Sequence, residues 1–116
     1  MSNINNSINY IEFPLTKSPE TKYFYDKVFG WEFTDWGPKY LSFTGAGVEG
    51  GFNGEDDAAI TKPGVLVVLY ASDLPQKLEE VISAGGNVIK PIYEFPGGKR
   101  FHFLDPNGNE LAIWSE

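Results

Sequence analysis

The sequence predicts an α+β fold built from two similar units, each with the order strand, helix, strand, strand, strand. This order occurs twice, at about 8–53 and about 64–116, and a polar segment at 54–63 separates the two copies. The chain has 116 residues, the size of one domain. Apolar residues make up 41% of it, and nine Phe, six Tyr and three Trp are available for a core. We therefore expect one domain in which each unit covers the other.

The first unit opens with a β-rich run, INYIEFPL, at 8–15. The segment KSPETKYFYDKVFGW at 17–31 predicts a helix. Its evidence is a stripe of Phe24, Val28 and Trp31, which recur at spacings of four and three and would face a core.

Both ends of this first helix carry sequence signals. Ser18 is the expected N-cap, because its hydroxyl can accept a hydrogen bond from a free backbone N–H. Pro19 suits the first helical position, and Gly30 is the expected left-handed stop. Three short strands, separated by Gly, Pro and Asp, should follow at 31–36, 39–45 and 48–54.

The second unit repeats the pattern. GVLVVLYA at 64–71 predicts a strand, and SDLPQKLEEVISAGG at 72–86 predicts a helix that ends at its two glycines. Ser72 or Asp73 is the expected N-cap. The apolar face of this helix is expected at Leu74, Leu78, Val81 and Ile82. Three further strands are expected at 87–95, 99–105 and 110–115.

The composition excludes several classes of function. The net charge is −7 and no basic cluster offsets it, so nucleic acid and anionic membranes should be repelled. The longest apolar run, at 65–71, is too short to span a bilayer, and the N-terminus lacks the pattern of a secretory signal. The absence of cysteine excludes disulfides and thiolate metal sites. We expect a cytoplasmic protein.

Three segments, FYDKVFGWEF, DL followed by AGGNVIKP, and FLDPNGNELAIW, resemble the vicinal oxygen chelate superfamily. This superfamily contains glyoxalases, bleomycin resistance proteins and extradiol dioxygenases. The sequence is most similar to the small bacterial branch related to lactoylglutathione lyase. The resemblance implies a glyoxalase-like fold, in which two βαβββ units form a curved mixed sheet around a cleft.

The resemblance also locates the metal ligands of the metal-dependent members. One ligand lies seven residues before the residue that opens each helix, and the last lies seven residues after the Asp of the D-P-x-G turn. In this sequence the turn begins at Asp105, and the three positions hold Tyr10, Leu66 and Ala112.

These residue types do not suit a metal ion. Catalytic zinc needs three N, O or S donors, and a facial iron triad needs two imidazoles, whereas the chain has one His. Glu49 lies in a strand where a fourth ligand is possible, but alone it holds nothing. The sequence therefore predicts no metal and no other cofactor.

The expected cleft extends along each strand, because side chains alternate between the two faces. His102 lies three residues before Asp105, at a position that faces the cavity in fosfomycin-resistance relatives. Together these rules predict a ligand-binding cleft lined by Tyr10, Glu12, Leu66, Val68, Tyr70, Arg100, His102, Ala112 and Trp114.

Three functions fit this cleft. The leading hypothesis is a metal-independent protein that binds a small molecule. The second is a metal-free lyase or isomerase that uses Glu12 and His102 as an acid–base pair, so enzymatic activity stays open. The third is an interaction module whose own side chains fill the cleft. Two other roles for Glu12 stay open. It would form a structural ion pair with Arg100, or it would be a ligand in a residual metal site with Glu49 and His102.

The partners follow from the same resemblance. We expect a small-molecule ligand, no nucleic acid, no membrane and a homodimer. Either the two units of one chain form one cleft, or units are exchanged between chains.

Overall fold

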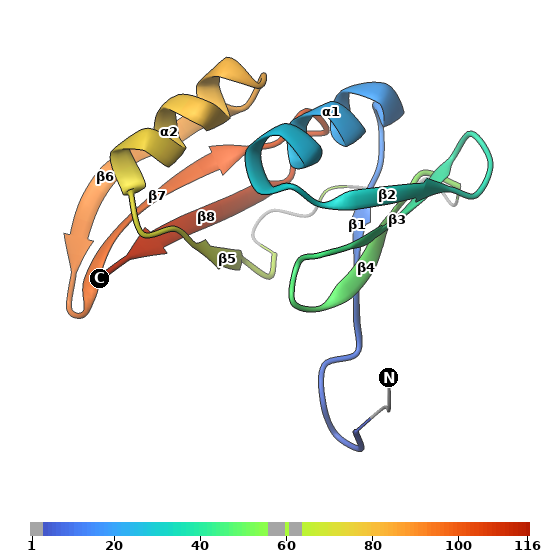
Figure 1. The fold of residues 1–116 in the computed structure, drawn as a ribbon, viewed down its shortest axis with the longest axis horizontal. Helices are drawn as coiled ribbons and strands as arrows, with labels where there is room; N and C mark the ends of the chain where they lie inside the picture. Colours follow the sequence, from blue (N-terminus) through green and yellow to red (C-terminus); the bar gives the residue numbers. More distant parts are fainter. Residues whose placement is uncertain (1–3, 56–59, 61–63) are drawn as a thin grey trace.

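The computed structural model describes residues 4–55, 60 and 64–116. Its element order confirms the predicted α+β fold of two βαβββ units (Figure 1). Most of the predicted linker at 54–63 lies outside the described residues. The elements are β1 (Tyr10–Pro14), α1 (Ser18–Phe29), β2 (Glu32–Asp35), β3 (Tyr40–Thr44), β4 (Glu49–Asn53), β5 (Val67–Tyr70), α2 (Leu74–Ser83), β6 (Asn87–Phe95), β7 (Gly98–Leu104) and β8 (Glu110–Ser115).

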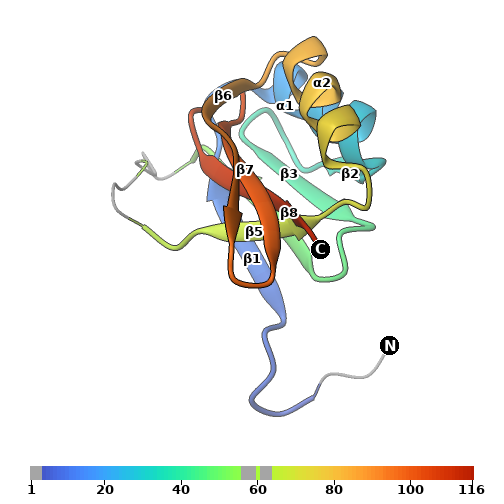
Figure 2. The same ribbon diagram turned by 90° about the vertical axis from the view of Figure 1, so that its left-hand side faces the viewer.

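Each unit contributes one four-stranded sheet. Sheet A has the order β1-β4-β3-β2, and sheet B has the matching order β5-β8-β7-β6. The first and last strands of each unit pair in parallel, with Glu12 opposite Gly51 in sheet A and Val68 opposite Ala112 in sheet B. Both helices lie on the same side of the two sheets (Figures 1 and 2). Neither helix is long and apolar enough to cross a membrane.

One aromatic core joins the two units. Phe24 and Tyr25 of α1 are fully buried, and the Phe24 ring lies 5.7 Å from that of Phe103 in sheet B. The Tyr25 ring lies 5.1 Å from that of Phe52 in sheet A. The helix of unit one thus packs against both sheets, so the units share their buried apolar surface.

The start of α1 differs from the prediction. Ser18 is the first helical residue, and the N-cap is Lys17, whose side chain makes no capping hydrogen bond. The side-chain oxygen of Asn107, in the turn before β8, accepts hydrogen bonds from the backbone N–H groups of Thr16 (2.7 Å) and Lys17 (2.9 Å). A distant residue therefore fixes the position at which the helix begins.

The other predicted helix signals are confirmed only in part. Pro19, predicted at the first helical position, is the second residue of α1. Gly30 ends α1 with a left-handed φ of 74°. Asp73 is the N-cap of α2 and accepts from the Gln76 N–H at 3.1 Å. Ile82, predicted on the apolar face of α2, is instead 50% exposed. Its neighbour Val81 is fully buried, and consecutive helical residues point about 100° apart.

Candidate functional site

Each sheet has one face against the core and one face turned away from it. Along β7, Phe101 and Phe103 are fully buried in the core. Arg100 and His102 alternate with them and therefore lie on the opposite face. We call the faces turned away from the core the open face of sheet A and the open face of sheet B.

One row across the open face of sheet B combines three aromatic side chains with an arginine. The strand register places Tyr93 opposite Arg100, Arg100 opposite Trp114, and Trp114 opposite Tyr70. Opposed residues on neighbouring strands point to the same side of a sheet. The Tyr70 and Trp114 rings meet edge to face with centroids 5.2 Å apart. Tyr70 is exposed and the other three are half-buried, so a ligand can reach the row.

His102 lies beside this row and has a partner at each ring nitrogen. Nε2 is 2.8 Å from the Tyr93 hydroxyl, and Nδ1 is 2.9 Å from Oε2 of Glu110. The Tyr93 hydroxyl also accepts a hydrogen bond from Nε of Arg100 at 2.5 Å. His102 itself is only 3% exposed. We call these four residues the His102 network.

One arrangement of protons satisfies every contact in this network. Arginine Nε can only donate, so the Tyr93 oxygen accepts there and its own proton is free for Nε2 of His102. A ring whose Nε2 accepts carries its proton on Nδ1, which faces Glu110. A neutral His102 with its proton on Nδ1 therefore satisfies each of these contacts.

The centre of the open face of sheet A holds a second network. The Tyr40 hydroxyl donates to Oε2 of Glu12 at 2.8 Å and lies 2.5 Å from the Tyr10 hydroxyl. Nδ2 of Asn53 donates to Oε1 of Glu12 at 3.3 Å. We call these four residues the Tyr40 network. Burial, with the hydrogen bonds to Tyr10 and Glu12, raises the pKa of Tyr40 well above its ordinary value, so its phenol stays neutral.

The structure does not join Glu12 to the polar residues of sheet B. Glu12 belongs to the Tyr40 network, whereas Arg100 and His102 belong to the His102 network. Among the described residues, no hydrogen bond or ion pair links Glu12 to either of them, or to Glu49. The predicted Glu12–Arg100 ion pair and Glu12–His102 acid–base pair are therefore absent from this structure, because Glu12 is bonded to Tyr40 in one sheet and His102 to Glu110 in the other.

The remaining predicted cleft residues also lie in sheet B or next to it. Ala112 lies directly opposite His102 and is fully buried. Val68, in the same row, is 41% exposed. Leu66 is half-buried and precedes the first residue of β5.

Four residues of these networks were not among the predicted site residues: Glu110, Tyr93, Tyr40 and Asn53. Glu110 follows from strand alternation, since it lies two positions before Ala112. Tyr93 does not, because register shifts on both sides of Lys90 interrupt the alternation along β6. Tyr40 reaches the centre of sheet A only because its partner strand carries Gly51. A Cβ there would lie 2.5 Å from the Tyr40 hydroxyl and 2.6 Å from that of Tyr10.

The positions expected for metal ligands do not fit a metal ion. Leu66 and Ala112 offer no lone pair, and the Tyr10 phenol is already bonded to Tyr40. The register also makes Gly51, not Glu49, the counterpart of Ala112 in unit one. In the described part of the chain, no three His, Cys, Asp or Glu side chains gather as a metal site requires.

An apolar groove of about 450 Å³ borders the open face of sheet B. Phe29, Trp31 and Phe43 are among the residues that line it. Val68 and Tyr70 of β5 line it as well and also belong to the open face. The groove and the row of aromatic residues thus meet at β5, where an apolar hollow adjoins polar groups.

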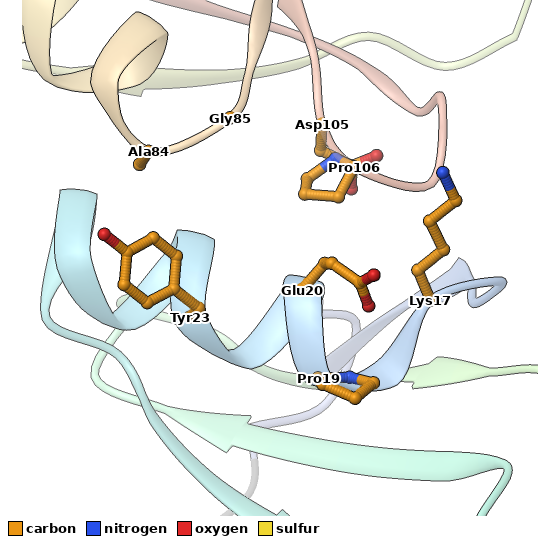
Figure 3. Close-up of a pocket in the computed structure, with 8 residues that line it drawn as sticks. All are labelled: Lys17, Pro19, Glu20, Tyr23, Ala84, Gly85, Asp105 and Pro106. Carbon is orange, nitrogen blue, oxygen red and sulfur yellow. The ribbon is translucent and has the colours of Figure 1, made fainter.

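A second crevice, of about 470 Å³, lies on the helix side of the molecule (Figure 3). Glu20 and Tyr23 of α1 line it together with the N-cap Lys17, facing the end of α2 and the turn that begins at Asp105. The Asp105 carboxylate already accepts five hydrogen bonds within the protein, one of them from Tyr25 at 2.8 Å. This crevice therefore offers exposed charges but no buried group that awaits a ligand.

Comparison with known proteins agrees with this architecture. The profile of the Glyoxalase/Bleomycin resistance protein/Dioxygenase superfamily matches residues 7–113. A glyoxalase-related enzyme from Fulvimarina pelagi has a similar structure, with a TM-score of 0.80 and 19% identity over 96% of this chain and 88% of its own. No curated protein matches the sequence significantly.

Two further solved structures are similar. A glyoxalase/bleomycin resistance protein/dioxygenase family enzyme from Burkholderia phytofirmans PsJN has a TM-score of 0.80 and 19% identity over 93% of this chain and 97% of its own. TnmS3, an antibiotic binding protein from Streptomyces sp. CB03234, has a TM-score of 0.69 and 20% identity over 97% of this chain and 98% of its own. At these identities, the likeness establishes the fold.

Proposed function

Because the chain belongs to the glyoxalase/bleomycin resistance protein/dioxygenase superfamily, we propose that it binds a small organic molecule without a metal ion. The proposed site is the open face of sheet B together with the adjoining apolar groove. The observation that carries the proposal is the row of Tyr93, Arg100, Trp114 and Tyr70 beside that groove. Aromatic surface with a few fixed polar groups is typical of small-ligand sites.

Other observations support this proposal. TnmS3 has a similar fold and is described as an antibiotic binding protein, so this fold can hold a small molecule. The residues at the three expected ligand positions, Tyr10, Leu66 and Ala112, do not suit metal binding, which supports metal independence. A cytoplasmic location is part of the proposal, because a chain without cysteine fits a reducing compartment.

A homodimer is a further part of the proposal. Tyr10 is 45% exposed on the open face of sheet A, and Val65 before β5 is 94% exposed. The strands β1 and β5 are also edge strands, each paired on one side only. A second copy would remove this apolar surface from water. Analytical ultracentrifugation should give twice the 12.9 kDa chain mass, and a monomer at all concentrations would contradict the homodimer.

A metal-free lyase or isomerase is the second candidate function. It is favoured by the chain of hydrogen bonds from Tyr93 through His102 to Glu110, which can move a proton along the sheet. The Glu12 of the original hypothesis takes no part in this chain. Turnover of a bound compound that is lost in His102→Gln would favour this candidate over simple binding.

A ligand screen tests the main proposal. Chelator-treated protein is screened by thermal shift against a library of small aromatic compounds, since a ligand of the native state raises its melting temperature. Trp114→Ala should abolish the shift, while Trp36→Ala, an exposed Trp outside sheet B, should leave it unchanged.

Two results would contradict the proposal. Stoichiometric Zn, Ni or Fe in the purified native protein would overturn metal independence. A screen without a single binder would favour the third hypothesis, an interaction module that holds no small molecule.

A further inference from the structure

We propose that the site prefers a flat aromatic molecule that carries a carboxylate, and that Arg100 binds this carboxylate. The inference rests on the proposed small-molecule function and names its ligand class. It is drawn from the pairing, the position and the surroundings of Arg100.

Within the described part of the protein, Arg100 has no carboxylate partner, although the chain is rich in carboxylates. It is the single arginine of the sequence, which has 16 acidic and nine basic residues. Among the described residues, the ion pairs are Lys22–Asp35 and Lys77–Glu80, while the contact of His102 with Glu110 is an ion pair only when the imidazole is protonated. The described part of the protein therefore leaves the charge of Arg100 unneutralised, although it lies half-buried in the sheet.

The guanidinium group of Arg100 is held in one position. Its Nε donates to the Tyr93 hydroxyl, and its Cζ lies 5.6 Å from the ring centroids of both Tyr93 and Phe95. These contacts occupy Nε and leave the two terminal nitrogens for a ligand. A planar guanidinium fork pairs well with a planar carboxylate, and a fork already fixed in place loses little freedom on binding.

The neighbours of Arg100 specify the rest of the ligand. Lys90, opposite His102 in the adjoining row, adds a second cation on the same face. Trp114 and Tyr70 extend the row on the other side and offer ring surface for an aromatic body. Two carboxylates also lie nearby, but Glu110 is engaged by His102 and Glu116 accepts from the Tyr70 hydroxyl at 2.6 Å. The face thus favours an anionic group at Arg100 and an uncharged ring beyond it.

Matched probes can test this preference. Binding of 2-naphthoate and of its uncharged analogue 2-naphthamide is measured by NMR titration of the full chain. Arg100→Gln removes the guanidinium, and Lys99→Gln, the exposed preceding residue on the other side of β7, removes the same charge as a control. Retention of the wild-type NMR spectrum outside the open face shows that each variant is folded.

We expect wild-type protein to bind 2-naphthoate about tenfold or more tightly than 2-naphthamide, since charged hydrogen bonds are the strong ones. Arg100→Gln should remove this preference by weakening 2-naphthoate alone, and Lys99→Gln should keep it. Should Arg100→Gln fail to fold, Arg100→Lys provides the test, because an ammonium lacks the fork and should reduce the preference several-fold.

Three results would overturn the inference. Equal binding of both probes by wild-type protein would exclude a carboxylate preference yet leave the proposed binding function in place. An equal loss of 2-naphthoate affinity in Arg100→Gln and Lys99→Gln would show that Arg100 acts only through the net charge of the protein. Failure of both probes to bind would overturn the ligand class, and the broader compound screen would then decide separately whether the site binds small molecules at all.

Discussion

Tyr93 is the residue on which the open face of sheet B depends. Its oxygen accepts from Nε of Arg100, and its proton is available to Nε2 of His102. Without that oxygen, the nearly buried His102 imidazole and the half-buried Arg100 guanidinium each lose a hydrogen-bond partner. A buried polar group left without a partner destabilises the fold by more than the net contribution of an ordinary hydrogen bond.

Tyr93→Phe should therefore lower the free energy of unfolding by about 1–3 kcal/mol. The measurement is urea unfolding of wild-type and variant protein. Tyr23→Phe is the control, because Tyr23 is 57% exposed and its loss of a hydroxyl should cost less than about 0.5 kcal/mol. Equal effects of the two substitutions would show that the network contributes nothing to stability.

Gly51 makes the Tyr40 network possible. In Gly51→Ala the new Cβ would lie 2.5 Å from the Tyr40 hydroxyl and 2.8 Å from the Leu41 carbonyl. Crowding of this kind should lower the free energy of unfolding by about 1–3 kcal/mol. In the double variant with Tyr40→Phe, the loss should be smaller than the sum of the single losses by about 0.5 kcal/mol or more, because one clash is gone. Simple additivity in urea unfolding would contradict the close contact.

Among the elements, α1 shows how far a local signal can mislead. Ser18 has the right chemistry for an N-cap, but the donors at this helix start are met by Asn107, which also contacts the buried hydroxyl of Thr21. The sequence contains no local sign of this contact. Asp73 of α2, which caps its own helix, was predictable from its neighbours alone.

Asn107→Ala should accordingly be more damaging than an ordinary lost cap. It removes the acceptor of two backbone N–H groups and the contact of Asn107 with Thr21, whose hydroxyl keeps only its hydrogen bond to the Lys17 carbonyl, so a loss of about 2–4 kcal/mol is expected. Asp73→Ala should lose about 1 kcal/mol. Thermal and urea unfolding of the two variants provide the comparison, and an Asn107→Ala loss no larger than that of Asp73→Ala would disprove the cross-unit cap.

The strands show what the sequence could and could not predict about the site. Alternation placed Arg100 and His102 on one face of β7 because that strand is regular. Alternation did not place Tyr93 on this face, because the register of β6 against β7 shifts twice. It also could not show that Glu12 and His102 belong to separate hydrogen-bond networks, since alternation fixes the face of a side chain but not the position of one sheet against another.

For the whole molecule, the repeated element order was enough to predict the fold. Each of the two short units has a sheet with one apolar face that must be buried, and the shared aromatic core buries both faces. The core itself creates a pH dependence. Tyr25 is fully buried, and this burial, with the adjacent Asp105, raises the pKa of its phenol well above the ordinary value of 10.0.

Stability should therefore fall in alkaline solution. Below pH 10 the Tyr25 phenol is protonated in both states and its contribution is complete. Above pH 10 the unfolded chain releases this proton while the folded protein retains it, so the free energy of unfolding falls by up to about 1.4 kcal/mol per pH unit. Urea unfolding between pH 9 and pH 11 should show a shallower decline for Tyr25→Phe than for wild type. Equal declines in wild type and Tyr25→Phe would exclude Tyr25 as a cause of the alkaline loss of stability.

The hydrogen bonds from Thr16 and Lys17 to Asn107 also affect the order of folding during synthesis. A ribosome makes the start of α1 long before the turn that holds it, 91 residues after Thr16. The first helix therefore leaves the exit tunnel without its cap and without half of its core. We therefore expect the nascent first unit to stay incomplete until the turn that holds Asn107 has been made.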